Sequence, residues 1–163
     1  MVGDAYIRGG TNANTNYGSD TFMGIRNDVD EEARKLLIKF DLPPRVISAT
    51  LTFTIVAIGN DASRTVRIRP ISNVWDESTV TWNSLGTITT SNAQDVQFDV
   101  AYSSSVPFDE VIDVSSLLPS SSGSTQTFSL VFDILSGYGD NTNFQIESKE
   151  EAGSSGATLS TAR

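Results

Sequence analysis

The sequence contains neither cysteine nor histidine. Their absence excludes a zinc site of the usual kind, a serine or cysteine nucleophile activated by histidine, and a histidine acid or base. Disulfides are excluded as well, so the cysteine content does not indicate whether the protein works in a reducing or an oxidising compartment.

Long hydrophobic runs and convincing helical patterns are also missing. No apolar stretch is long enough to cross a bilayer as a helix, and we expect no membrane partner. The one helix candidate, residues 28–39, starts with acidic residues, but Ile38, Phe40 and Leu42 then recur at period two. We interpret this stretch as a loop that leads into a strand.

Positive charge is scarce in the second part of the chain. The formal net charge is −9. Residues 1–69 contain nine Lys/Arg and eight Asp/Glu, a net charge of +1. From residue 70 onward there are two Lys/Arg and twelve Asp/Glu, a net charge of −10. We therefore expect no nucleic-acid partner. The first part can still present a local cationic face to an anionic polymer; alternatively, the acidic loops only keep the domain soluble.

The sequence does contain many short segments in which apolar and polar residues alternate, rich in Thr, Val, Ile and Phe, as is typical of half-buried strands. Each large apolar side chain contributes about 1.5–3 kcal/mol when it is buried, so these segments suffice for one core between two sheets. Their apolar positions are Leu51, Phe53 and Ile55; Val66 and Ile68; Val96, Phe98 and Val100; Phe128, Leu130, Phe132 and Ile134; Phe144 and Ile146.

Clusters of glycine, serine, asparagine and aspartate separate these segments, for example at residues 9–12, 59–61, 119–123 and 137–141. Many short strands, regular turns and no helix predict an all-β fold, an antiparallel β-sandwich of jelly-roll type. A chain of 163 residues is expected to form one domain, so we treat residues 1–163 as a single module.

Five stretches, in this order and spacing, resemble a known family. They are residues 4–10 (Asp-Ala-Tyr-Ile-Arg-Gly-Gly), 13–18 (Ala-Asn-Thr-Asn-Tyr-Gly), 34–42 (Arg-Lys-Leu-Leu-Ile-Lys-Phe-Asp-Leu), 75–83 (Trp-Asp-Glu-Ser-Thr-Val-Thr-Trp-Asn) and 147–152 (Glu-Ser-Lys-Glu-Glu-Ala). The chain resembles the domain known by its Asp-Asn-Arg-Leu-Arg-Glu motif, which includes carbohydrate-binding module family 96. It departs from the pattern after Asn83, where Ser84 replaces a second Asn and the usual Pro is absent.

The resemblance implies a β-jelly-roll module carried by polysaccharide lyases and other exported bacterial enzymes, with alginate as the ligand of some members. We accordingly expect a non-catalytic module that recognises an anionic polysaccharide such as alginate and targets an attached lyase or hydrolase to it. Residues 1–3 lead directly into a strand-like stretch, which suits a module of a longer secreted protein. The alternatives are a structural or adhesive spacer that binds no glycan, and an enzyme, although no sequence signature selects a catalytic pair.

The candidate ligand-binding residues are cations and loop residues of the first part. With the apolar face of each strand turned inward, Arg8, Arg26, Lys35 and Lys39 form one cationic strip on the outer face of a sheet, which Arg67 and Arg69 would extend. The planar fork of arginine matches a uronate carboxylate. Arg34, Asn16 and Tyr17 complete the candidate set, with Tyr17 as a stacking platform. The alternative is that these cations are ordinary solvent-facing residues that protect edge strands.

The two tryptophans and several acidic residues are further candidates. Trp75 and Trp82 are interpreted mainly as anchors, and Trp82 is predicted to pack inward because it shares parity with Val80. A structural calcium ion is a candidate cofactor, because jelly-roll sugar binders often hold one. Residues 28–32 offer carboxylates, but Ala33 and Lys39 stand where an EF-hand loop needs Gly and Glu. Asp4 and residues 140–141 are other sources of oxygen ligands, and the ligand set stays unassigned.

Overall fold

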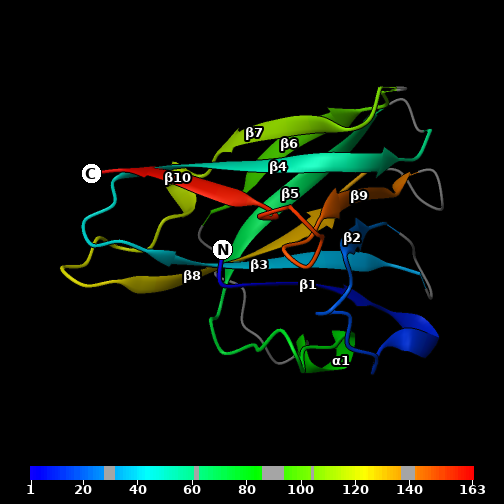
Figure 1. Cartoon of the computed structure of the whole chain (residues 1–163), viewed down its shortest axis with the longest axis horizontal. Helices are drawn as coiled ribbons and strands as arrows, with labels where there is room; N and C mark the ends of the chain where they lie inside the picture. Colours follow the sequence, from blue (N-terminus) through cyan, green and yellow to red (C-terminus); the bar gives the residue numbers. More distant parts are fainter. Residues whose placement is uncertain (28–31, 61–62, 86–93, 104, 137–141) are drawn as a thin grey trace.

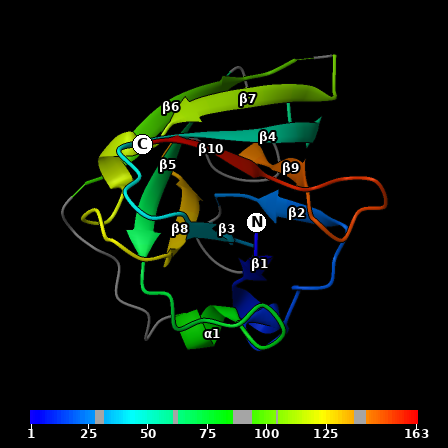
Figure 2. The ribbon, with the colours of Figure 1, turned by 60° about the vertical axis from the view of Figure 1, so that its left-hand side comes forward.

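The computed structural model describes residues 1–27, 32–60, 63–85, 94–103, 105–136 and 142–163. Two antiparallel sheets pack face to face, as Figures 1 and 2 show. Sheet A holds five strands in the order β1 (Gly3–Arg8), β3 (Arg34–Leu42), β8 (Gln126–Ile134), β5 (Ser63–Ile71) and β6 (Val96–Ala101). Sheet B has the order β10 (Thr158–Ala162), β4 (Ser48–Ile58), β9 (Phe144–Glu147) and β2 (Phe22–Ile25), and β7 (Phe108–Asp113) pairs with β4.

Most consecutive strands lie in opposite sheets, so the chain crosses repeatedly from one sheet to the other, as in jelly-roll sandwiches. Helical structure in the described residues is confined to α1 (Trp82–Leu85) and two 3-10 turns, Gly10–Asn12 and Ser115–Leu117. None of the described helices is long and apolar enough to pass through a membrane. The predicted all-β sandwich is therefore confirmed.

The main core lies between the sheets and is built from alternate residues of the strands. Phe53 of β4 meets Phe132 of β8 edge to face, with ring centroids 5.9 Å apart. All the predicted alternating segments supply strands, and their apolar positions fill this core. Strand β7 was not predicted from the sequence.

A second, smaller core lies on the outer face of sheet A, where residues 72–85 cross over the strands near α1 (Figure 2). The register of β1 and β3 places Ala5 opposite Leu37, so both side chains point to this outer face. The expectation that Ala5 and Ile7 face the main core was wrong. They are buried instead beneath the crossing segment, together with Leu37, Ile71, Trp75, Val80 and Val131.

Candidate functional site

Three arginines meet at one end of the sandwich. Strand β1 ends at Arg8, β3 begins at Arg34, and the antiparallel register sets these two residues opposite each other. Arg34 also forms a bridge with Arg26, immediately after β2, through two backbone hydrogen bonds of 3.2 and 2.9 Å. This bridge joins β3, the strand next to the edge of sheet A, to the residue after β2, an edge strand of sheet B, so residues from both sheets contribute to the same site.

The carboxylate of Glu32 lies among the three arginines, which we call the arginine cluster (Arg8, Arg26 and Arg34). Its Oε1 accepts a hydrogen bond from Arg8, and its Oε2 lies 3.4 Å from Nη2 of Arg34 and 3.8 Å from Nη1 of Arg26. The hydrogen bond from Arg8 lowers the pKa of the Glu32 carboxyl. The formal charges of these four side chains, three positive and one negative, sum to +2.

A pocket of 310 Å³ opens beside the arginine cluster. Arg26, Arg34 and Lys35 line it together with Trp82 and Asp133. The Lys35 ammonium lies 5.3 Å from the centroid of the Trp82 ring, and burial lowers the pKa of this lysine. The remaining lining residues are Gly9, Gly10, Asn27, Ala33 and Ile134.

Glycine at position 9 allows the Trp82 ring to lie close to the backbone. A Cβ atom at Gly9 would come 3.4 Å from the ring carbon Cε2, and 3.6 Å from two other ring atoms. The ring is half-buried and packs on the second core, so the inward packing predicted for Trp82 is confirmed in part. The same residue also forms a wall of the pocket.

Tyr17 stacks on Tyr6 next to Arg8. The ring centroids are 4.5 Å apart and the planes are inclined by 22°, while the Tyr6 hydroxyl donates a 2.9 Å hydrogen bond to Asp20. The hydrogen bond to Glu32 raises the pKa of Arg8, and Tyr17 acts in the same direction. Tyr17 therefore belongs to the surroundings of the arginine cluster, with one face covered by Tyr6.

The side chain of Asn16 holds a loop in place. Its amide nitrogen donates hydrogen bonds of 2.8 Å to the carbonyl oxygens of Glu77 and Val80, and its Oδ1 accepts one of 3.2 Å from the Gly18 amide. The first two bonds tie this loop to the segment that carries Trp82, and the third is a local bond within the loop. A direct role of Asn16 in ligand binding stays a prediction.

The prediction that the cations form one strip on the outer face of a sheet is wrong. Arg8 pairs with Arg34, whereas Ile7 pairs with Lys35, so Arg8 and Lys35 lie on opposite faces of sheet A. Lys39 shares the outer face with Lys35, but the two are four residues apart along β3, about 13 Å. Lys39 lies 4.3 Å from the Trp75 ring centroid and donates hydrogen bonds to the carbonyl oxygens of Asn73 and Trp75.

Arg67 and Arg69 do not extend a free cationic surface, because both contact Asp133. Arg67 makes two hydrogen bonds to this carboxylate, of 3.1 and 2.6 Å, and Arg69 makes one of 3.3 Å. The structure thus gathers Arg8, Arg26, Arg34, Lys35 and Tyr17 from the candidate set at one end of the sandwich and leaves Lys39 apart.

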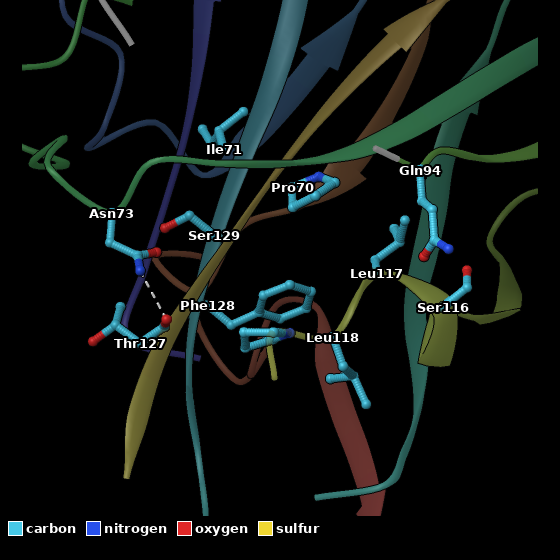
Figure 3. Close-up of a pocket in the computed structure, with 11 residues that line it drawn as sticks. Pro70, Ile71, Asn73, Gln94, Ser116, Leu117, Leu118, Thr127, Phe128 and Ser129 are labelled. Carbon is cyan, nitrogen blue, oxygen red and sulfur yellow. Dashed lines mark hydrogen bonds between the residues drawn. The ribbon is translucent and has the colours of Figure 1, made fainter. Parts of the chain in front are cut away.

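A second pocket, of 270 Å³, lies between β5, β8 and the turn at Ser115–Leu117 (Figure 3). Phe128, Leu117 and Leu118 supply apolar walls, and Asn73 donates a 2.8 Å hydrogen bond to the carbonyl oxygen of Thr127. Among the residues that the structure describes, none that lines this pocket is charged. It suits a neutral group better than an anionic polymer.

Carboxylates that could hold a metal ion come together at Asp4, Glu77 and Glu150, with one oxygen of each within 4.8 Å of the others. The ammonium of Lys149 already lies among them, 2.7 Å from Glu77 and 3.9 Å from Asp4, and it hydrogen-bonds to Glu150. These residues form what we call the Lys149 network. Of the candidate calcium ligands, Asp4 is in this network, and residues 28–31 and 140–141 lie outside the described residues. Calcium binding stays a prediction.

The Lys149 network also links three of the stretches that carry the family resemblance, residues 4–10, 75–83 and 147–152. Besides the ion pairs, the Asp4 amide donates a 2.9 Å hydrogen bond to Glu77, and the Lys149 amide donates a 3.0 Å bond to Asp4. The network therefore fixes β1, the segment over sheet A, and the turn after β9 to one another.

Fold and site together define the class of protein. An antiparallel sandwich carries at one end a pocket that is lined by cationic side chains and edged by an aromatic ring, an arrangement that can bind a ligand. The family model of carbohydrate-binding module family 96 matches residues 1–161, and the chain belongs to this family. No curated protein matches the chain.

Sequence reasoning missed three features of the site. Glu32 was grouped with the neighbouring acidic residues, although it stands two positions before Arg34. Trp82 was interpreted mainly as an anchor, and Asp133 was not singled out. The approach of Arg26 to Arg34 depends on a bridge between two sheets, for which local periodicity gives no signal.

Proposed function

We propose that this carbohydrate-binding module recognises an anionic, uronate-containing polysaccharide, with alginate as the leading candidate, at the arginine cluster and the adjoining pocket. In this proposal the module has no catalytic activity and holds an attached lyase or hydrolase of an exported bacterial protein on its substrate. The observation that supports it most is the convergence of Arg8, Arg26 and Arg34, with Lys35, beside a pocket walled by Trp82.

The chemistry of these groups suits such a ligand. A guanidinium can present two parallel N–H donors to a carboxylate, and the uronate units of a polysaccharide repeat this group along the chain. The Trp82 ring lines the pocket, where it can contact a sugar ring together with the nearby Lys35. At 310 Å³ the pocket is at the small end of ligand sites, which span about 300–1,000 Å³, so it suits a short section of the polymer.

The positions of the carboxylates speak against catalysis at this pocket. A glycosidase needs two carboxyl groups on either side of the scissile bond. Asp4, Glu77 and Glu150 are close enough to each other, but none of them lines the pocket, and Lys149 binds all three. Asp133 does line the pocket, but it is engaged by Arg67 and Arg69.

The test is isothermal titration of the module with alginate oligosaccharides, with cello- and xylo-oligosaccharides as neutral controls, at low and at high salt. We expect binding to alginate alone, weakened by salt because partly exposed ion pairs are screened over about 8–10 Å. Arg26→Gln and Arg34→Gln should each weaken it by about tenfold or more. Arg45→Gln is the matched control, since exposed Arg45 lies between β3 and β4 at the other end of these strands.

Two results would contradict the proposal in different ways. Binding of a neutral oligosaccharide that is indifferent to salt would move the site to the uncharged pocket of Figure 3. The absence of binding to every glycan tested would favour the structural or adhesive spacer.

A further inference from the structure

We infer that Glu32 is an internal competitor of the ligand: its carboxylate occupies the place in the arginine cluster that a carboxylate of the polysaccharide takes, and binding displaces it. This inference rests on the proposed function. It names a residue that sets affinity and selectivity at the site while opposing the ligand instead of contacting it.

The position of Glu32 is that of a bound carboxylate. Both of its oxygens are used, Oε1 by Arg8 and Oε2 by Arg34 at 3.4 Å and Arg26 at 3.8 Å. The arginines come from β1, from β3 and from the end of β2, so a single planar anion connects three segments of the fold. A uronate carboxylate has the same shape and charge as the Glu32 side chain, and two such anions repel each other if both enter the cluster.

The contacts of Glu32 are of a kind that can be exchanged. The side chain is 32% exposed, and the residue precedes β3, whose first residue is Arg34. Rotation of the side chain therefore breaks no strand hydrogen bond. Partly exposed ion pairs contribute little each, so replacement of Glu32 by a ligand carboxylate with equal contacts costs little.

Asp133 provides an internal comparison. Its carboxylate also bridges arginines, but it is only 13% exposed and accepts the fork of Arg67 through both oxygens at 3.1 and 2.6 Å. It lies within β8, in the middle of sheet A, and is directly opposite Arg67 in the register. Asp133 has the geometry of a permanent structural pair, whereas Glu32 has that of an exchangeable one.

The arginine cluster would remain in place without Glu32, because the backbone positions it. Arg8 and Arg34 are paired within sheet A, and Arg26 and Arg34 are joined by two backbone hydrogen bonds. Removal of the Glu32 charge changes the net charge of the group from +2 to +3 without removing any element that supports it. The variant is thus expected to present the same cations with more attraction for an anion.

The test compares the wild type with Glu32→Gln and Glu32→Ala by titration with alginate oligosaccharides at low salt, with the fold of each variant checked by circular dichroism. We expect both variants to bind about three- to tenfold more tightly than the wild type. Asp109→Asn is the charge-matched control, because exposed Asp109 lies on β7, which β4 and β9 separate from β2 by about 14 Å. This control should leave the affinity unchanged.

The outcomes separate the inference from the proposed function. If the wild type binds and both Glu32 variants bind equally or more weakly, Glu32 orients the arginines and the inference is overturned, while the function stands. Binding by the variants alone would support the inference in its strongest form. If neither the wild type nor the variants bind any uronate, the proposed function fails and the inference with it. An equal gain in Asp109→Asn would reduce the effect to overall charge and also overturn the inference.

Discussion

Arg8 and Arg34 lie directly opposite each other on adjacent antiparallel strands, so two guanidinium groups of like charge share one cross-strand position. Like charges in this arrangement destabilise a sheet. Here the Glu32 carboxylate contacts both arginines and offsets their repulsion. The backbone pairing thus holds two cations at one position, and the nearby anion offsets part of the cost of their repulsion.

A first prediction concerns the stability of the free module. Glu32→Gln should lower the melting temperature at low salt, because the arginines lose their counter-charge, and the difference from the wild type should shrink as salt is added. Thermal unfolding followed by circular dichroism at several salt concentrations measures this. Asp109→Asn, which removes a charge away from the cluster, should show no such salt-dependent loss. Equal melting temperatures of Glu32→Gln and wild type at low salt would contradict the repulsion argument.

The two tryptophans should differ in what they contribute. Trp75 is 4% exposed in the second core, so Trp75→Ala should lower the free energy of unfolding by about 3–5 kcal/mol. Trp82 is half-buried and lines the pocket, so Trp82→Ala should cost only about 1–3 kcal/mol but should also weaken glycan binding. Urea unfolding and titration on the same samples separate the two effects. A Trp82→Ala variant with wild-type affinity would remove this ring from the binding site.

The strands were predictable from the sequence because sheet B and the inner side of sheet A bury one face each. Leu51, Phe53 and Ile55 alternate with threonines along β4, and period two suffices to identify such a strand. Strand β1 shows where this reasoning fails. Ala5 and Ile7 are the more apolar side of β1, but a crossing segment buries them on the outer face, while Tyr6 and Arg8 point inward near the end of the sandwich.

The candidate site was predictable in its residue types but not in its arrangement. The sequence contains the cations, and the preference of arginine for carboxylates follows from its chemistry. Which cations meet depends on the register of β1 on β3 and on the bridge from Arg26 to Arg34, both of which are long-range. Because side chains alternate between the two faces of a strand, the wrong face assigned to β1 was enough to predict Arg8 on the same face as Lys35. In the structure Arg8 shares its face with Arg34.

The Lys149 network gives a further prediction. Lys149→Met would leave the carboxylates of Asp4, Glu77 and Glu150 close together without their cation. Loss of one partner from a fully buried ion pair costs about 3–5 kcal/mol; since the Lys149 side chain is 26% exposed, we expect about 1–3 kcal/mol. Urea unfolding measures the change. The matched control is Lys39→Met, which removes a lysine that contacts backbone carbonyls and no carboxylate in the described structure; equal losses in both variants would contradict the role assigned to Lys149.

Asp4 should make the stability of the module depend on pH. Burial raises its pKa to about 7, although a hydrogen bond from the Lys149 amide acts to lower it. The pKa of an aspartate in the unfolded chain is about 3.9. Between about pH 4 and pH 7 the folded chain therefore holds a proton that the unfolded chain has released, and the free energy of unfolding should fall as pH rises, by at most about 1.4 kcal/mol per unit. Asp4→Asn keeps an acceptor for Lys149 and should flatten this dependence in urea unfolding at pH 5 to about 8. Burial acts to raise the pKa of Glu150, but hydrogen bonds from Lys149 and Ser148 outweigh it and lower the pKa. A carboxyl group of this kind acts in the opposite sense, because its contribution to stability is lost only as the pH falls. A slope in Asp4→Asn equal to that of the wild type would show that another group holds the proton.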